Sequence, residues 1–233
     1  MMIKASARPA RDTVSAKGEI ARAKIKASAL AVMEELGYHK MRIADVTAHA
    51  GVAAGLFYHY FYDLKSLTQE VLEDFVSHSL RAEAIEKGVV DGDWYGLILA
   101  HNRIVVKAYA ERPGIMRCLL QLADEEPAFA TILRANFVRQ LNWLTRHMPE
   151  MFPAADFTAH QAVMVVYTLA GTGETILRDY YVNRERVLVK KKLSLDEMTE
   201  LISVMFYRGL FLENPPADKL HYAANLVGMK KQP

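Results

Sequence analysis

The stretch Arg42–Phe61, with the sequence RIADVTAHAGVAAGLFYHYF, contains two short apolar patterns separated by a glycine. Ile43, Val46 and Ala50 fall on one face of a helix that is expected over 42–50. Gly51 then interrupts the pattern, at a position where a tight turn needs a positive φ. The spacing therefore predicts a short helix that ends at a sharp corner.

A second short helix is expected over 53–61. Phe57 and Phe61 are four residues apart and give this helix one apolar side. Its other side carries Ala54, Leu56, Tyr58, His59 and Tyr60. Two helices joined by a tight turn form a helix-turn-helix, in which the second helix is free to lie in a major groove of DNA.

The charge distribution of the 233-residue chain fits a basic N-terminal module. Residues 1–62 carry nine Lys or Arg and five Asp or Glu, an excess of four positive charges. Because the whole chain has a net charge of +2, the remainder is slightly acidic. A basic N-terminal third on an acidic body indicates a module that faces phosphates.

Several features indicate a cytoplasmic protein without a membrane partner. Cys118 is the single cysteine, so no intrachain disulfide can form. Residues 1–15 lack the apolar run of a secretory signal. The longest apolar run, 162–171, is far shorter than the roughly 20 residues of a membrane helix.

Apolar periodicity predicts an all-α protein of about nine helices, with no sustained alternation typical of strands. Besides the pair in the helix-turn-helix, helices are expected over 17–36, 64–87, 93–112, 115–123, 127–147, 157–182 and 195–214. Three parts follow: a flexible basic arm over 1–16, a helix-turn-helix DNA-binding domain over 17–80 with its motif at 42–61, and a larger helical domain over 81–233.

The same residues resemble a known family. Ala50-Gly51-Val52, Gly55-Leu56-Phe57-Tyr58-His59-Tyr60-Phe61 and Leu64-Lys65-Ser66-Leu67 resemble the pattern of the tetracycline-repressor (TetR) family. Glu35-Leu36-Gly37-Tyr38 and Ile43-Ala44-Asp45-Val46 fit it too. The resemblance covers residues 20–75 closely, and farther along it holds at the level of the helix pattern.

The resemblance and the chemistry of the side chains together give a set of expected DNA contacts. These are Arg42, Thr47, Ala53, Ala54, Gly55, Leu56, Tyr58, His59, Tyr60 and Lys65. Arg42 also fits a solvated charge, Tyr60 a packed aromatic, and Thr47 an exposed helix hydroxyl. Ala53 and Leu56 depart from the family's usual polar residues, so we expect apolar contacts with thymine methyl groups there.

The resemblance also implies that the body over 81–233 forms a homodimer and binds a small-molecule effector. The expected dimer-interface residues are Val163, Val166, Ala170, Gly173, Val204, Met205, Gly209 and Leu212. Pocket candidates are His101, Tyr109, Met116, Phe137, Trp143 and Tyr167. Few charges interrupt the apolar faces of the helices over 93–147, so a largely apolar effector is expected.

No residue pattern indicates catalysis, a cofactor or a metal. The histidines lack metal-ligand spacing, and neither a Gly-rich phosphate loop nor a nucleophile elbow is present. The expected function is a transcriptional regulator, most simply a repressor, that binds a palindromic double-stranded DNA operator. The alternative left open by the sequence is a nonspecific architectural DNA-binding dimer without an effector.

Overall fold

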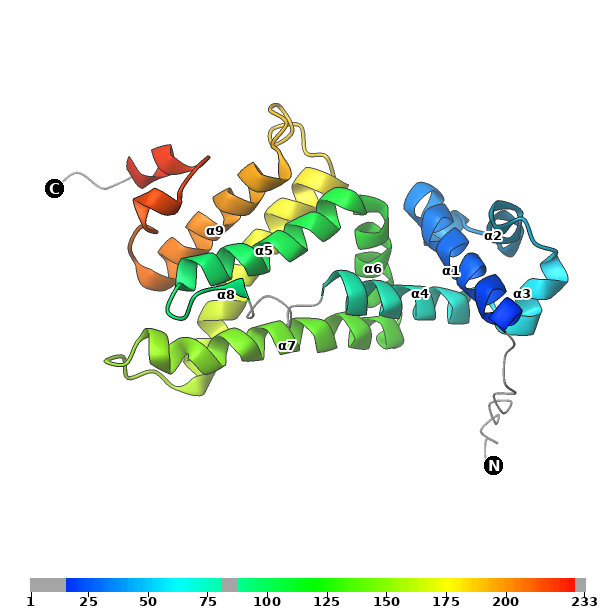
Figure 1. Cartoon of the computed structure of the whole chain (residues 1–233), viewed down its shortest axis with the longest axis horizontal. Helices are drawn as coiled ribbons and strands as arrows, with labels where there is room; N and C mark the ends of the chain where they lie inside the picture. The colour runs from blue at the N-terminus through cyan, green and yellow to red at the C-terminus, as the bar shows by residue number, and fades with distance from the viewer. Residues whose placement is uncertain (1–15, 81–87, 229–233) are drawn as a thin grey trace. The chain divides into compact units, whose positions relative to one another are not determined.

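The computed structural model describes residues 16–80 and 88–228, and these residues form helices and no strands (Figure 1). The expected all-α fold is confirmed. The expected arm over 1–16 falls almost entirely outside the described residues, as does the expected continuation of the fourth helix over 81–87. The longer helices are α1 (Ala16–Leu36), α2 (Ile43–Ala50), α3 (Ala54–Tyr60), α4 (Leu64–Ser79), α5 (Trp94–Glu111), α6 (Pro113–Glu125), α7 (Pro127–Met151), α8 (Ala159–Leu177) and α9 (Leu195–Phe211).

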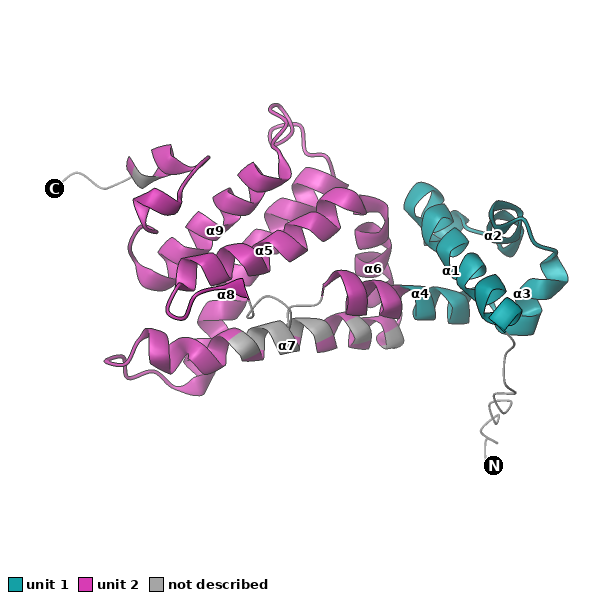
Figure 2. Cartoon of the chain, viewed as in Figure 1, with its two compact units in different colours: residues 1–71 teal, residues 72–233 magenta. Residues whose placement is uncertain are grey.

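The chain divides into two compact units, residues 1–71 and 72–233 (Figure 2). The division falls inside α4, whereas the sequence placed the domain boundary after residue 80. Val71 and Leu72, on either side of the division, are both buried. One continuous helix therefore contributes side chains to both units.

The first unit packs α1, α2, α3 and the start of α4 around a small apolar core. Ile25, Ala29 and Val32 of α1 are buried, as the helical spacing predicts. Leu36, the last residue of α1, is 40% exposed. Gly37 follows with a φ of 79°, which a residue without a Cβ adopts most readily.

In the second unit, α5 packs most extensively on α9, while α7 packs on α6 and α8. Tyr95 of α5 meets Tyr207 of α9 edge to face, with 5.7 Å between ring centroids. The Asn102 amide donates to the Ser203 hydroxyl at 3.0 Å between the same two helices. These contacts fix α5 against α9 and form one wall of the body.

The predicted ends of α7, α8 and α9 are wrong, and α9 ends at Phe211 and not at residue 214. α7 continues to Met151 through Pro149, although the sequence predicted its end before this proline. Pro149 lies in the last turn, where one lost backbone hydrogen bond costs little, and the buried Met148 keeps that turn packed. α8 ends at Leu177 and continues as a π-helical segment, η3 (Arg178–Val182).

Short helical segments follow α9 and are held by a buried carboxylate. These are η4 (Ala217–Lys219) and η5 (Ala224–Gly228). Glu200 of α9 is 3% exposed, and its carboxylate accepts hydrogen bonds from the backbone N–H groups of His221, Tyr222 and Ala223 at 2.6–3.0 Å. The C-terminal segment is thereby attached to the body.

Candidate functional site

The turn between α2 and α3 has the geometry that the sequence predicts. Gly51 adopts φ 60° and ψ 42°, the left-handed conformation that L side chains rarely take. The Val52 N–H donates to the Thr47 carbonyl at 3.0 Å and closes the end of α2. Arg42 caps the start of α2, where its backbone N–H donates to the Asp45 carboxylate at 2.8 Å.

The α3 helix has a buried side and an exposed side. Phe57 is fully buried and its ring centroid lies 5.8 Å from that of Phe61, which begins the next segment. The opposite side exposes Ala54, Gly55, Tyr58 and His59, with Tyr58 62% exposed. Leu56 and Tyr60 are partly buried. A helix anchored by aromatic side chains thus presents small and polar residues outward.

The remaining expected DNA contacts differ in accessibility. Arg42, Ala53 and Lys65 are exposed. Thr47 is 4% exposed, and its hydroxyl donates to the Ala44 carbonyl at 3.2 Å within α2. Thr47 therefore packs inside the first unit and does not present the exposed hydroxyl that the sequence suggested.

Two exposed side chains beside the motif escaped the sequence analysis. The Lys24 ammonium lies 3.8 Å from the position that a Cβ on Gly51 would occupy, next to the turn. Tyr62 is 87% exposed directly after α3. The signal for Tyr62 was its place after the aromatic run, whereas the position of Lys24 depends on how α1 packs on α2.

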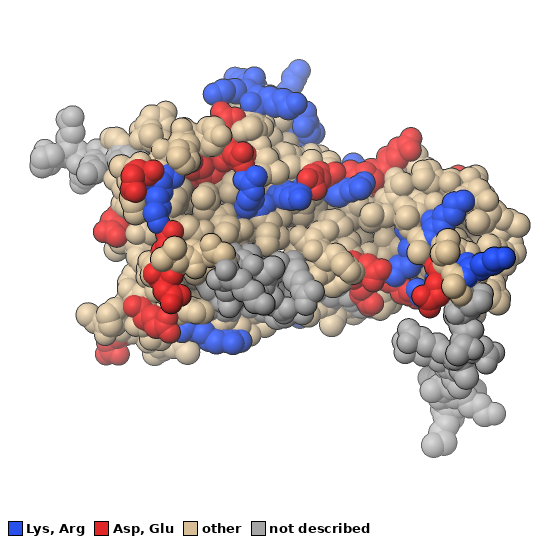
Figure 3. Space-filling model, in the orientation of Figure 1, with Lys and Arg blue, Asp and Glu red and all other residues tan. Residues whose placement is uncertain are grey.

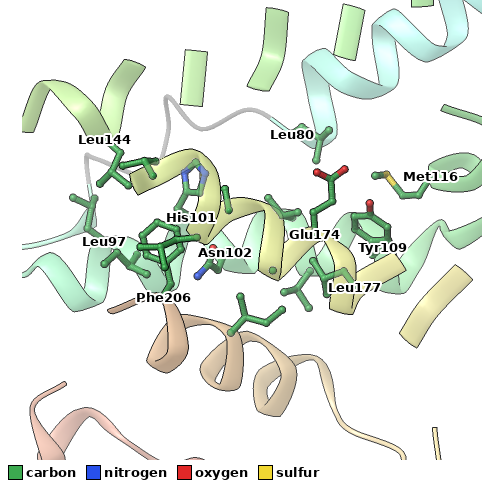
Figure 4. A pocket seen from close by; sticks show the side chains of 18 of the residues that line it. Leu80, Leu97, His101, Asn102, Tyr109, Met116, Leu144, Glu174, Leu177 and Phe206 are labelled. Carbon is green, nitrogen blue, oxygen red and sulfur yellow. The ribbon is translucent and has the colours of Figure 1, made fainter. Parts of the chain in front are cut away.

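A second feature is a cavity within the body, between α5, α6, α7, α8, α9 and the end of α4 (Figure 4). It encloses about 140 Å³. Its described wall is mostly apolar, and its polar members are His101, Asn102, Tyr109 and Glu174. Leu80, just beyond the end of α4, also lines it.

The expected pocket residues divide into three groups. His101, Tyr109 and Met116 line the cavity. Tyr167 is 56% exposed and lies outside the lining. The side chains of Phe137 and Trp143 fall outside the described ones. The sequence did not single out Glu174, because a glutamate inside a long helix gives no sign of its burial.

The expected dimer-interface residues also separate. Val166 and Val204 are buried in the core of a single protomer, and Ala170 and Gly173 line its cavity. Val163 packs partly buried against the same core. A Cβ on Gly209 would lie 2.5 Å from Leu169, so this glycine permits close approach of α8 and α9 within one chain.

Other apolar side chains on α8 and α9 face outward. Met205 is 53% exposed and Leu212, at the end of α9, is 91% exposed. On α8, Met164 and Val165 are 52% and 41% exposed, although the sequence analysis did not select them. An unpartnered apolar surface therefore runs over parts of both helices.

Among the described residues, no cluster of His, Cys, Asp or Glu has the arrangement of a metal site. No helix in the described ranges is long and apolar enough to cross a membrane.

Comparison with known families bears on the first unit. The family described as "Bacterial regulatory proteins, tetR family" matches residues 25–71, which include α2, the turn and α3. Residues 25–71 are therefore similar to the DNA-binding domain of the tetR family. This part of the chain contains a helix-turn-helix of the kind found in that family of transcriptional regulators. No curated protein sequence matches the chain.

Solved TetR-family structures share the fold over most of the chain. A TetR-family transcriptional regulator from Bordetella parapertussis is 18% identical, with a TM-score of 0.59, and the match covers 79% of this chain and 93% of that one. A TetR-like regulator from Rhodococcus sp. RHA1 is 16% identical, with a TM-score of 0.60 and coverage of 82% and 96%. The fatty acid degradation regulator FadR from Bacillus halodurans is 18% identical, with a TM-score of 0.61 and coverage of 82% and 94%. At these identities the likeness concerns the fold alone.

Proposed function

We propose that this protein is a TetR-family repressor that binds a palindromic operator as a homodimer and is released by a small, largely apolar effector. In this proposal, residues 17–80 bind DNA and residues 81–233 bind the effector and the second protomer. The observation that carries the proposal is the outward face of α3. Its exposed Tyr58 and His59 lie beside small residues, while Phe57 anchors the helix from behind.

The proposed contacts divide by chemistry. Arg42, Lys65 and the hydroxyl of Tyr58 donate to backbone phosphates, and the exposed Lys24 and Tyr62 extend this set. His59 and Tyr60 donate to a phosphate or a base edge. Ala53, Ala54 and Leu56 contact thymine methyl groups, and Gly55 allows the helix to approach closely. Thr47 is left out because its side chain is buried.

A homodimer is required because one short recognition helix contacts too few bases for high specificity. The exposed Met164, Val165, Met205 and Leu212 support an interface formed by α8 and α9. Gly209 is exposed, so it can contact a second protomer. It also lies against Leu169, where it lets α8 and α9 pack closely within one chain. Two protomers related by a two-fold axis would read the two halves of a palindrome.

Effector release is supported by the position of the cavity relative to α4. This helix begins directly after the helix-turn-helix, and Leu80 beyond its end lines the cavity. A ligand that binds the cavity more tightly in one arrangement of α4 shifts the population toward that arrangement. If the spacing of the two recognition helices in that arrangement does not match successive major grooves, the protein releases the operator.

The test is selection of binding sites from a randomised DNA pool by the full chain, at about 150 mM salt because phosphate contacts are salt-dependent. Enrichment of a palindrome with thymines near each recognition helix is expected. Binding without any enriched sequence would reject the sequence-specific repressor and favour the architectural alternative.

Tyr58→Ala on the selected operator tests the docking of α3. Loss of a neutral phosphate donor is expected to weaken binding by about tenfold, while the dependence of affinity on salt, which reflects Lys and Arg contacts with phosphates, changes little. Tyr222→Ala, which removes an exposed tyrosine of the body, is the matched control. Equal affinity of the Tyr58 variant and the wild type for the operator would contradict the proposed contact.

A further inference from the structure

The cavity wall has an uneven charge. Its described lining contains one carboxylate, Glu174, and neither a lysine nor an arginine. The Asn102 amide is already engaged with Ser203. A dense cluster of basic side chains in the body lies instead on the exposed loop between η3 and α9, over 184–192 (Figure 3). Within the described part of its wall, the cavity therefore has an acidic group and no lysine or arginine.

Glu174 is held in an environment that penalises its charge. Burial raises the pKa of its carboxyl group above the ordinary value, and the positive charge of Arg178, one turn farther along the helix, opposes this rise only in part. The Arg178 side chain is half exposed, and its Nε lies 3.8 Å from the Asp179 carboxylate. The arginine is thus shared between solvent and another acid, and it neutralises Glu174 incompletely.

Tyr109 provides a second polar group at the same end of the cavity. In Figure 4 the Glu174 carboxylate and the Tyr109 hydroxyl lie close to Leu80 and Met116, while His101 and Asn102 lie farther along. Tyr109 is 1% exposed, and its hydroxyl interacts with the Glu174 carboxylate without forming a well-aligned hydrogen bond in the described structure. Burial, followed by the negative charge of Glu174, raises the pKa of this hydroxyl, so it stays neutral. The oxygen of this hydroxyl can still accept a hydrogen bond from a ligand that reaches this end of the cavity.

We infer that the cavity binds a small lipophilic amine, whose ammonium group donates to the Glu174 carboxylate and the Tyr109 hydroxyl oxygen. Its apolar part lies against Leu97, Ile98 and Phe206 in the rest of the cavity. An ammonium supplies the missing positive charge, and in a poorly solvated site such a pair is stronger than in water. A carboxylate ligand would instead place a second negative charge beside Glu174.

The cavity volume limits the size of this amine. At about 140 Å³ it matches engineered apolar cavities that accept a benzene ring. A single ring or a short branched chain with one amino group fits this space. The role of this amine as the effector rests on the proposed repressor function, whereas its binding in the cavity does not.

The experiment compares three probes of one size and different charge on the full chain: benzylamine, benzyl alcohol and benzoate. Titration calorimetry or ligand-observed NMR is expected to give benzylamine an affinity about tenfold or more above that of benzyl alcohol, with benzoate weakest. Glu174→Gln keeps the shape of the side chain and removes its charge. It is expected to abolish the preference for the amine while changing the affinity for benzyl alcohol little.

Two further variants separate charge from folding. Tyr109→Phe removes the hydroxyl and is expected to weaken benzylamine binding less than Glu174→Gln does. Glu150→Gln, at an exposed site on α7, controls for the loss of one acidic charge and is expected to bind all three probes like the wild type. Thermal unfolding of each variant verifies that the body is intact.

The inference is overturned if benzyl alcohol or benzoate binds as tightly as benzylamine, if none of the three binds, or if Glu174→Gln retains the preference. The ligand-free DNA selection is measured separately. If the protein selects a palindrome but does not prefer the amine, only the inference about the cavity is overturned, and the proposed repressor function stands. Amine binding by a protein that selects no DNA sequence would support the cavity chemistry and reject the repressor.

Discussion

Ala53 occupies the N-cap position of α3. Its side chain has no oxygen that could accept a hydrogen bond from the N–H groups of the first turn. Its backbone has φ −67° and ψ 145°, the extended conformation usual for this position, and no side-chain hydrogen bond caps the helix. Serine at this position can accept from the N–H groups of the first turn. The recognition helix therefore begins with unsatisfied donors that face outward.

Ala53→Ser is expected to raise the free energy of unfolding by about 1 kcal/mol, because the hydroxyl supplies the missing cap. Urea titration followed by circular dichroism measures the change. Ala54→Ser places the same hydroxyl one residue inside the helix, where no gain is expected. Equal stability of the two variants would show that the cap position has no special effect here.

Asp93 caps the start of α5 and also binds the C-terminal segment. Its carboxylate accepts from the Gly96 N–H at 2.8 Å and pairs with the Lys219 ammonium at 2.5 Å. Burial by itself raises the pKa of this carboxyl, but the hydrogen bonds from Lys219 and Gly96 and the charge of Lys219 outweigh it. The net result is a pKa below the ordinary value of 3.8.

Because the folded-state pKa of Asp93 is lowered, its stabilisation is present above the ordinary value and is lost as the pH falls through the lower folded value. Asp93→Asn keeps the cap acceptor and removes the charge. It is expected to cost roughly 1 kcal/mol of unfolding free energy at neutral pH, and less as the pH falls below about 4. Urea titrations over this range measure the difference, with the exposed Asp91→Asn as control. A difference that does not change with pH would contradict the assignment.

At the scale of elements, local patterns predicted most of the helices. The turn at Gly51 and the apolar pair Phe57 and Phe61 are local signals, and the structure agrees with both. At the start of α4, the Asp63 carboxylate accepts from the Ser66 N–H at 2.7 Å, which is likewise a short-range interaction. The end of α7 beyond Pro149 could not be predicted, because tertiary packing there overrides a local helix-breaking preference.

The attachment of the C-terminal segment by Glu200 was also beyond sequence reasoning. The spacing between this glutamate and its partners, about twenty residues away, has no periodicity that a local pattern detects. Only the packed structure brings α9 and the segment around Tyr222 together. A buried carboxylate that accepts several backbone hydrogen bonds stabilises such a contact strongly.

Glu200→Gln is expected to lower the unfolding free energy by roughly 2 kcal/mol, because an amide replaces one acceptor oxygen by a donor among backbone N–H groups. Hydrogen exchange at Tyr222 and Ala223 should accelerate more than exchange elsewhere in the body. Glu150→Gln on the exposed side of α7 is the control. Unchanged protection of these two amides would show that the carboxylate does not hold the segment.

At the scale of the whole molecule, the two candidate sites were predictable to different degrees. The exposed face of α3 follows from periodicity within one short helix, so most of its residues were named from the sequence. The cavity is formed by side chains from several helices, and its acidic member, Glu174, became evident only from the packed body. Likewise, Val166 and Val204 share the small apolar character of interface residues but are buried inside one protomer.

The exposed apolar surface of α8 and α9 provides a test of the proposed homodimer. Met205→Lys places a charge at a side chain that is 53% exposed in the single protomer. If two protomers bury it, the dimer dissociation constant should rise by about tenfold or more, because an unpaired charge would lose its hydration. Sedimentation velocity measures this change, and affinity for the selected palindrome should fall with it. Val90→Lys, at a side chain that is 77% exposed and lies outside both helices, should leave both unchanged. A Met205 variant that dimerises like the wild type would exclude this surface from the interface, and the palindrome would then require a different pairing of protomers.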